Sequence, residues 1–196
     1  MQEVEIKAKY TNCSQEELEK YLLQHGFNRH QRVIQKDYYY NHPARDFRVT
    51  DEALRIRMEQ RENKEPLGYI TYKGINHSET GQNRLEIETT LTDVEKTQRI
   101  LQALGFTSVA LVHKDRTEFC KKDITLCLDR LEGIGTYIEI EKLISETSPN
   151  ANTNASTNAS SYAETEKELL ALLQKLDFIH PVIEPATYLE LVMRQS

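Results

Sequence analysis

Charged and apolar residues alternate along several short segments of this chain. At its start, Glu3, Glu5 and Lys7 alternate with three apolar residues. Successive side chains of a β-strand point to opposite faces of the sheet, so this period predicts a strand with one charged face and one apolar face. The same alternation recurs in further segments, at residues 54–58, 69–73, 84–88, 114–116, 124–129 and 137–141.

Three of these predicted strands are followed by the pattern of an amphipathic helix. The helices are expected within residues 15–25, 93–104 and 162–176, where apolar residues recur at helical spacing. Each follows a residue pair with the spacing of a capping box, namely Ser14 with Glu17, Thr92 with Glu95 and Ser161 with Glu164. We interpret the three strand–helix units as an internal duplication.

The chain length predicts a single domain over residues 1–196. Its third unit is interrupted by "TSPNANTNASTNASS", from Thr147 to Ser161. This Asn/Ser/Thr-rich stretch has no large apolar side chain to bury. It therefore predicts a mobile surface loop inside the domain, at about residues 147–161.

The charged faces of the strands carry acids and bases in clusters. Like charges two residues apart on a strand lie about 6–7 Å from each other, so they repel unless opposite charges lie between them. One interpretation is a solvated sheet face. The other is an α+β fold whose antiparallel strands curl into a barrel or tunnel, with a charged, wet interior and the helices packed outside. The charged set comprises Glu3, Glu5, Glu86, Glu88, Asp129, Glu139 and Glu141 with Lys7, Arg55, Arg57, Lys73, Arg84, Lys114 and Arg116.

A wet cavity lined by both acids and bases suits a polyphosphate ligand. Arg and Lys side chains would hold its oxygens, and Glu and Asp would hold its divalent metal. The all-oxygen donor set favours Mg²⁺ or Mn²⁺. Zinc is disfavoured because the histidines are scattered and no Cys/His spacing supports it.

Composition narrows the classes of partner. The chain has 31 acidic and 25 basic residues, interleaved along the sequence, which argues against a nucleic-acid surface. The chain has three cysteines, Cys13, Cys120 and Cys127, and no two of them form a Cys-x-x-Cys motif. We therefore expect reduced thiols and a cytoplasmic protein. No segment approaches the roughly 18 apolar residues of a membrane span, so no membrane partner is expected.

Several segments resemble the CYTH superfamily, the triphosphate tunnel metalloenzymes. "EVEIK" has the Glu-x-Glu-x-Lys signature, and "ALRIR", "TYKG", "RLEIE", "KDR" and "LDRLEGIGTYIEIE" follow in the family's order. The stretch "DYYYNHPARDFRVTDEALRIR" and the closing "TYLELV" resemble the class IV adenylyl cyclase branch most. This resemblance covers nearly the whole chain and implies an eight-stranded antiparallel tunnel that acts on triphosphates with a divalent metal.

The resemblance also implies roles for individual residues. Those expected to bind substrate phosphates are Lys7, Arg55, Arg57, Lys73, Arg84, Lys114 and Arg116. Those expected to hold metal are Glu3, Glu5, Asp129, Glu139 and Glu141, supported by Glu86 and Glu88. The catalytic candidates are Glu5, Lys114, Arg116 and Tyr39. Of these, Tyr39 is the tyrosine that matches the family's Asp-x-Tyr pattern. Packing of strand aromatics is the simpler interpretation of the tyrosines at 38–40.

Three functions stay open at the level of the sequence. The first is an adenylyl cyclase that converts ATP to cyclic AMP and pyrophosphate. The second is a hydrolase of inorganic tripolyphosphate or thiamine triphosphate, which would use the same phosphate-binding residues. The third is a non-catalytic polyphosphate or nucleotide sensor, which would need fewer carboxylates than this chain has. The resemblance also suggests a homodimer, which no residue pattern by itself indicates.

Overall fold

The computed structural model describes residues 2–75, 84–144 and 155–195. Eight strands of six residues or more form the sheet, and a two-residue ninth strand extends it. They are β1 (Gln2–Lys9), β2 (Asn28–Asn41), β3 (Ala53–Arg61), β4 (Leu67–Lys73), β5 (Glu86–Leu91), β6 (Thr107–Lys121), β7 (Ile124–Leu131), β8 (Gly135–Ile144) and β9 (Val182–Ile183). The helices are α1 (Gln15–Gln24), α2 (Phe47–Thr50), α3 (Val94–Ala103), α4 (Ala155–Gln174) and α5 (Tyr188–Met193), with a 3₁₀ turn at Asp177–Ile179.

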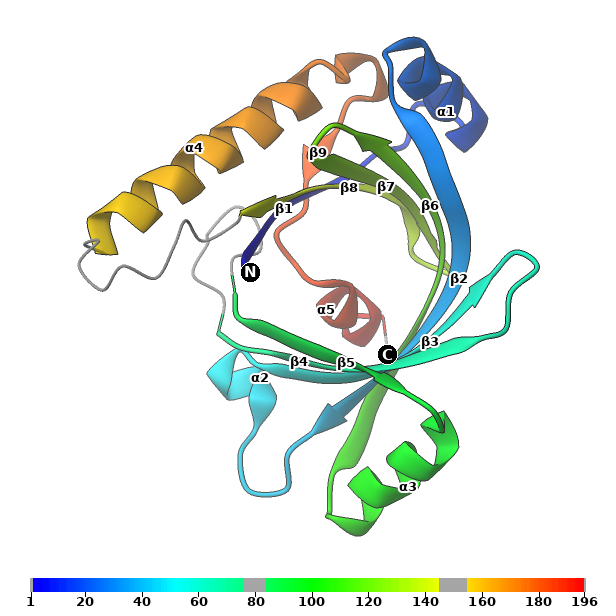
Figure 1. The fold of residues 1–196 in the computed structure, drawn as a ribbon, viewed down its shortest axis with the longest axis vertical. Helices are drawn as coiled ribbons and strands as arrows, with labels where there is room; N and C mark the ends of the chain where they lie inside the picture. The colour runs from blue at the N-terminus through cyan, green and yellow to red at the C-terminus, as the bar shows by residue number, and fades with distance from the viewer. Residues whose placement is uncertain (1, 76–83, 145–154, 196) are drawn as a thin grey trace.

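All strand pairs are antiparallel, in the order β5-β4-β3-β2-β6-β7-β8-β1-β9. The sheet curls strongly, so that β4 and β5 face β1 and β8 across a central space (Figure 1). Within the described residues β5 and β9 are the two edges of the sheet. The predicted curled antiparallel fold is therefore confirmed.

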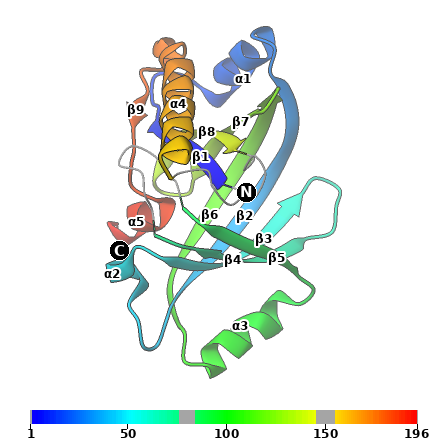
Figure 2. The same ribbon diagram turned by 60° about the vertical axis from the view of Figure 1, so that its left-hand side comes forward.

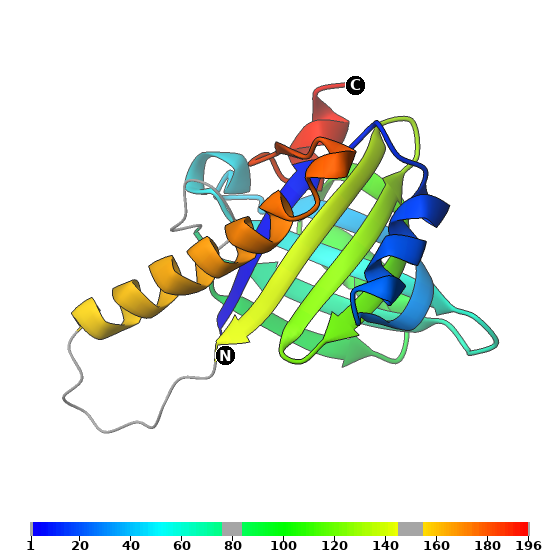
Figure 3. The same cartoon turned by 90° about the horizontal axis from the view of Figure 1, so that it is seen from above.

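The convex face of the sheet is apolar, as the alternation predicts. Ile6, Ile138 and Ile140 are fully buried there, together with Leu18 and Leu22 from α1 and residues of α4. Figure 3 shows α1 and α4 lying across β1, β7 and β8. A smaller cluster, which includes Tyr40, Ile56 and Leu101, packs α3 against the other half of the sheet. The charged side chains are left to face the inside of the curl.

Helix α5 lies at one end of the curled sheet, beside α2, rather than on its convex face (Figures 1 and 2). Tyr188 and Leu191 of α5 are buried in a cluster with Tyr39, Val112 and Tyr137. A capping box formed by Thr187 and Glu190 begins the helix. The sequence pattern did not predict this helix or its position.

Two helix starts differ from the predictions. The capping box of Ser14 and Glu17 is confirmed, but Asp93 rather than Thr92 caps α3 by accepting a hydrogen bond from the backbone of Lys96. Helix α4 begins at Ala155, so the loop prediction was wrong for residues 155–161. The reason is that the later turns of this helix pack on the sheet and small polar residues form its first turns. Residues 147–154 of the predicted loop lie outside the described residues.

The buried face of α1 supplies a test of the core. Leu18→Ala should lower the free energy of unfolding by about 2–5 kcal/mol, because Leu18 is fully buried and its removal leaves a cavity. Leu23→Ala in the same helix is the matched control, since Leu23 is 51% exposed and its change should cost well under 1 kcal/mol. Urea denaturation measures both; equal losses would contradict this packing.

Candidate active site

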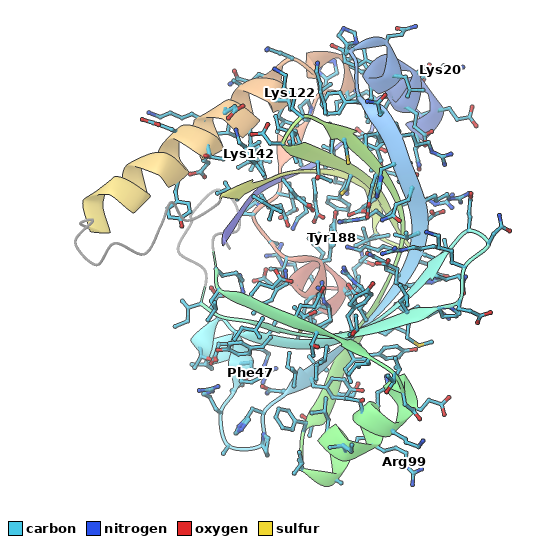
Figure 4. All side chains as sticks on the ribbon, viewed as in Figure 1. Lys20, Phe47, Arg99, Lys122, Lys142 and Tyr188 are labelled. Atoms are coloured by element: carbon cyan, nitrogen blue, oxygen red, sulfur yellow. The ribbon has the colours of Figure 1, made fainter. Side chains whose placement is uncertain are left out.

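The charged face of the sheet surrounds a cavity of about 240 Å³. The charged residues predicted for the lumen line this cavity, with the exception of Asp129. The side chain of Glu3 lies outside the described part of the structure. Figure 4 shows the side chains that converge on this space around the labelled Tyr188. The charged lining residues are Glu5, Lys7, Asp37, Arg55, Arg57, Lys73, Arg84, Glu86, Glu88, Lys114, Arg116, Glu139 and Glu141.

One arginine of the cavity is fixed by a carboxylate that the sequence reasoning missed. Asp37 on β2 accepts two hydrogen bonds from Arg57, at 2.7 Å from Nε and 2.7 Å from Nη2, and lies 3.6 Å from Arg55. Burial alone would raise the pKa of Asp37, but the two guanidinium groups outweigh it and hold that pKa well below its usual range. The signal was present in the sequence, since Asp37 shares the strand phase of Tyr39.

Arg116 has the densest set of acidic partners. Its Nε and Nη2 donate to Asp129 at 2.8 Å and 2.6 Å, and it also contacts Glu139 closely and Glu141 at 3.4 Å. The pKa of Arg116 is raised well above its ordinary value because these acids outweigh the effect of burial. Arg116 is thus held rigidly, charged, at the wall of the cavity.

Asp129 is placed differently from its prediction as a metal ligand. It is buried behind the cavity wall, and its carboxylate accepts hydrogen bonds from Arg116 and from the Tyr188 hydroxyl, the latter at 2.8 Å. Lys114 Nζ lies 3.9 Å from the same carboxylate. Asp129 therefore orients bases instead of facing the cavity.

Three carboxylates are grouped closely enough to hold a metal ion. Oxygens of Glu5, Glu139 and Glu141 lie within 4.8 Å of one another, on the neighbouring strands β1 and β8. Burial and then Glu139 raise the pKa of Glu5 to about 8, whereas Arg116 holds the pKa of Glu139 below its usual range in spite of burial. A cluster of three carboxylates that offers only oxygen ligands fits a hard divalent cation such as Mg²⁺ or Mn²⁺.

The acids of β5 pair with bases, as their predicted supporting role requires. Glu86 lies 2.9 Å from Lys73, and both Glu86 and Glu88 lie 3.6 Å from Arg55. Arg84 is placed at the rim, where it donates to the backbone oxygen of Asp51 at 3.3 Å. These contacts fix the bases of β3 and β4 in the lumen.

Tyr39 lines the cavity and is buried. Burial raises the pKa of its phenol, so the group stays protonated near neutral pH and suits hydrogen-bond donation better than proton acceptance. Tyr40 instead packs in the cluster under α3. The neighbouring tyrosines are therefore divided between the two faces of β2.

A second, more apolar chamber of about 110 Å³ adjoins the charged cavity between α2 and α5. It shares Tyr39, Ala53, Arg84, Thr187 and Leu189 with the charged cavity. Its other lining residues are Tyr40, Asn41, Phe47, Arg48, Asp51, Glu52, Val109, Glu190 and Met193. The two cavities therefore share part of their walls, but one is lined mainly by charged groups and the other is more apolar.

A curled antiparallel sheet around a cavity of paired acids and bases defines the class of this protein. The chain matches the CYTH domain over residues 1–154 and belongs to that family. It is 34% identical over 193 residues to the protein named "Putative adenylate cyclase MJ0240" of Methanocaldococcus jannaschii, covering 97% of this chain and 98% of that one.

Solved structures agree with this assignment. The PH1819 protein of Pyrococcus horikoshii OT3 superposes with a TM-score of 0.82 at 35% identity, covering 99% of both chains. The Hippeastrum protein HpAC1 has the same fold, with a TM-score of 0.67 at 20% identity, covering 99% of this chain and 96% of that one. Among the described helices, none is long and apolar enough to cross a membrane.

The raised pKa of Glu5 predicts a pH-dependent stability in the metal-free protein. Because this pKa lies at about 8 in the fold against an ordinary 4.5, the contribution of protonated Glu5 to stability is complete below pH 4.5 and is lost as the pH rises through 8. In EDTA, Glu5→Gln should match the wild type in melting temperature at pH 5 and exceed it by several degrees at pH 9.

The control for this comparison is Glu16→Gln, which changes an exposed glutamate on α1. It should track the wild type at both pH values, as measured by thermal denaturation followed by circular dichroism. A constant difference between Glu5→Gln and the wild type from pH 5 to pH 9 would show that Glu5 is not buried among carboxylates.

Proposed function

We propose that this protein is a metal-dependent enzyme that acts on a triphosphate, and that its reaction is the conversion of ATP to cyclic AMP and pyrophosphate. The observation that carries the proposal is the cavity itself. It brings two strongly held arginines, Arg57 and Arg116, together with a carboxylate cluster that includes Glu5. A chain of phosphates is the ligand that needs both fixed cations and a metal.

Each part of the cavity would have a distinct role. Arg57 and Arg116 would bind phosphate oxygens without moving, since Asp37 and Asp129 already orient their guanidinium groups. Lys7 and Lys114 would add ammonium donors to the phosphate oxygens. A divalent cation held by Glu5, Glu139 and Glu141 would neutralise charge on the phosphates.

In the cyclase reaction, the ribose 3′-hydroxyl releases its proton to solvent and its oxygen bonds to the α-phosphorus. The bond from that phosphorus to the bridging oxygen of pyrophosphate breaks. Negative charge develops on the departing pyrophosphate, and Arg57, Arg116 and Lys114 are the groups available to stabilise it. Most of the acceleration would come from positioning and charge neutralisation, for which rigid, paired bases are suited.

The side chamber supports a substrate with an organic group at one end. It adjoins the phosphate cavity and offers Phe47, Val109 and Met193 as apolar contacts, which a bare tripolyphosphate would leave unused. The relative from Methanocaldococcus jannaschii carries the name of an adenylate cyclase. Both observations favour a nucleotide.

Hydrolysis of inorganic tripolyphosphate or thiamine triphosphate is the second candidate. HpAC1 is described as a putative adenylyl cyclase with a dominant triphosphatase activity. The same phosphate-binding residues would serve either reaction, because the two differ in which phosphorus atom meets the nucleophile.

Product analysis separates the two reactions. Purified protein with Mg²⁺ or Mn²⁺ should convert ATP to cyclic AMP and pyrophosphate, and Glu139→Gln should lower that rate by about a hundredfold or more because it removes a ligand charge. ATP, tripolyphosphate and thiamine triphosphate are incubated in parallel and the products resolved by chromatography. Orthophosphate released from tripolyphosphate much faster than cyclic AMP forms from ATP would establish the hydrolase instead.

Filling the side chamber tests its role in binding the organic group. Met193→Trp should weaken ATP binding at least about tenfold and leave tripolyphosphate binding within about twofold, because Met193 lines the side chamber and not the charged cavity. Met193→Leu is the matched control, since it keeps the volume of the chamber nearly unchanged. Calorimetric titration in EDTA measures both ligands; a parallel loss for ATP and tripolyphosphate would contradict this role.

A further inference from the structure

The aromatic ring of Tyr188 contacts two lysines of the cavity. Lys7 Nζ lies over the ring at 4.6 Å from its centroid, and Lys114 Nζ lies over it at 5.0 Å. The lysines come from β1 and β6, whereas the ring comes from α5. One side chain of the last helix thus connects two distant strands at the phosphate cavity.

These lysines have few acidic partners of their own. Lys7 forms no ion pair with a carboxylate among the described residues, and Lys114 has only Asp129, at 3.9 Å. Both ammonium groups are nevertheless buried. The face of an aromatic ring stabilises a desolvated cation electrostatically, and it does so without a carboxylate that would compete for the N–H donors.

The ring is itself held firmly. Its hydroxyl donates to Asp129 Oδ2 at 2.8 Å, the oxygen that also accepts from Arg116 at 2.6 Å. The ring of Tyr137 packs edge-on against it, with 5.4 Å between centroids. Asp129 therefore fixes Arg116 and Tyr188 together, and Tyr188 in turn contacts Lys7 and Lys114.

We propose that Tyr188 is a positioning residue for the substrate phosphates. Its ring keeps the ammonium groups of Lys7 and Lys114 at the cavity with their N–H donors free for phosphate oxygens. This inference rests on the proposed triphosphate function for its ligand, and on the observed ring contacts for its geometry.

Two substitutions separate the ring from its hydroxyl. Tyr188→Phe keeps the ring and should bind inorganic tripolyphosphate within about threefold of the wild type. Tyr188→Leu removes the ring and should bind it about tenfold more weakly or worse, since it loses both cation–π contacts. Calorimetric titration in EDTA measures affinity without turnover. Wild-type affinity in Tyr188→Leu would overturn the proposal.

A double-mutant cycle distinguishes positioning from general support of α5. In the Lys7→Met, Lys114→Met background, Tyr188→Leu should weaken tripolyphosphate binding much less than it does in the wild type, because the ring no longer has a cation to hold. Leu191→Ala is the control, since it loosens the buried face of α5 but keeps the ring. Equal fold-losses in both backgrounds would mean that Tyr188 only supports the helix, and would overturn the proposal.

A second measurement does not depend on any substrate. The ε-methylene protons of Lys7 and Lys114 should be shifted upfield by the ring current in ¹H–¹³C spectra, with assignment by Lys7→Arg and Lys114→Arg. The shifts should persist in Tyr188→Phe and vanish in Tyr188→Leu. Unshifted signals in the wild type would overturn the proposal. Shifted signals in a wild-type protein that does not bind tripolyphosphate would show that the ring contacts exist and that the proposed function is wrong.

Discussion

The structure depends on the burial of many charges inside a curled sheet. Ions removed from water are costly unless each is closely paired, and here the strongest pairing is between Arg116 and Asp129. Asp129 sits behind the cavity wall, so it can hold Arg116 from the rear and leave part of the guanidinium facing the lumen. Asp37 and Arg57 form a second pair of this kind on β2 and β3, in which Asp37 itself lines the cavity.

This pairing is uneven, and the unevenness gives the cavity its chemistry. Arg57 is paired with Asp37, and Arg116 contacts Asp129 as well as Glu139 and Glu141 of the carboxylate cluster. Glu5 lies beside those carboxylates, and its pKa is raised to about 8 by burial and by Glu139. A metal–phosphate pair would supply a cation near Glu5 and anionic oxygens near the arginines at once, which is a stronger constraint on the ligand than the net charge of the chain.

The alternation of charge along the strands was enough to predict one charged face, because successive side chains of a strand take opposite faces. It left open whether that face is solvated or lines a tunnel. The same alternation could not predict which of the charged side chains line the cavity and which are buried behind its wall. Asp129 and Arg116 share a face, yet only Arg116 lines the cavity, since the Asp129 carboxylate is held by Arg116 and by the Tyr188 hydroxyl. Tyr188 was also beyond the pattern, because a helix of six residues is too short to show a periodic signature and its position at one end of the curl follows from tertiary contacts.

Helix α5 is where recognition of the two ends of a substrate would meet. Its first residue, Tyr188, contacts the lysines of the charged cavity, and its last residue, Met193, lines the apolar chamber. The CYTH match ends at residue 154, so α5 lies beyond the part of the chain that defines the family. Under the proposed function, the choice between a nucleotide and a bare polyphosphate would therefore depend on a helix that the family match does not cover.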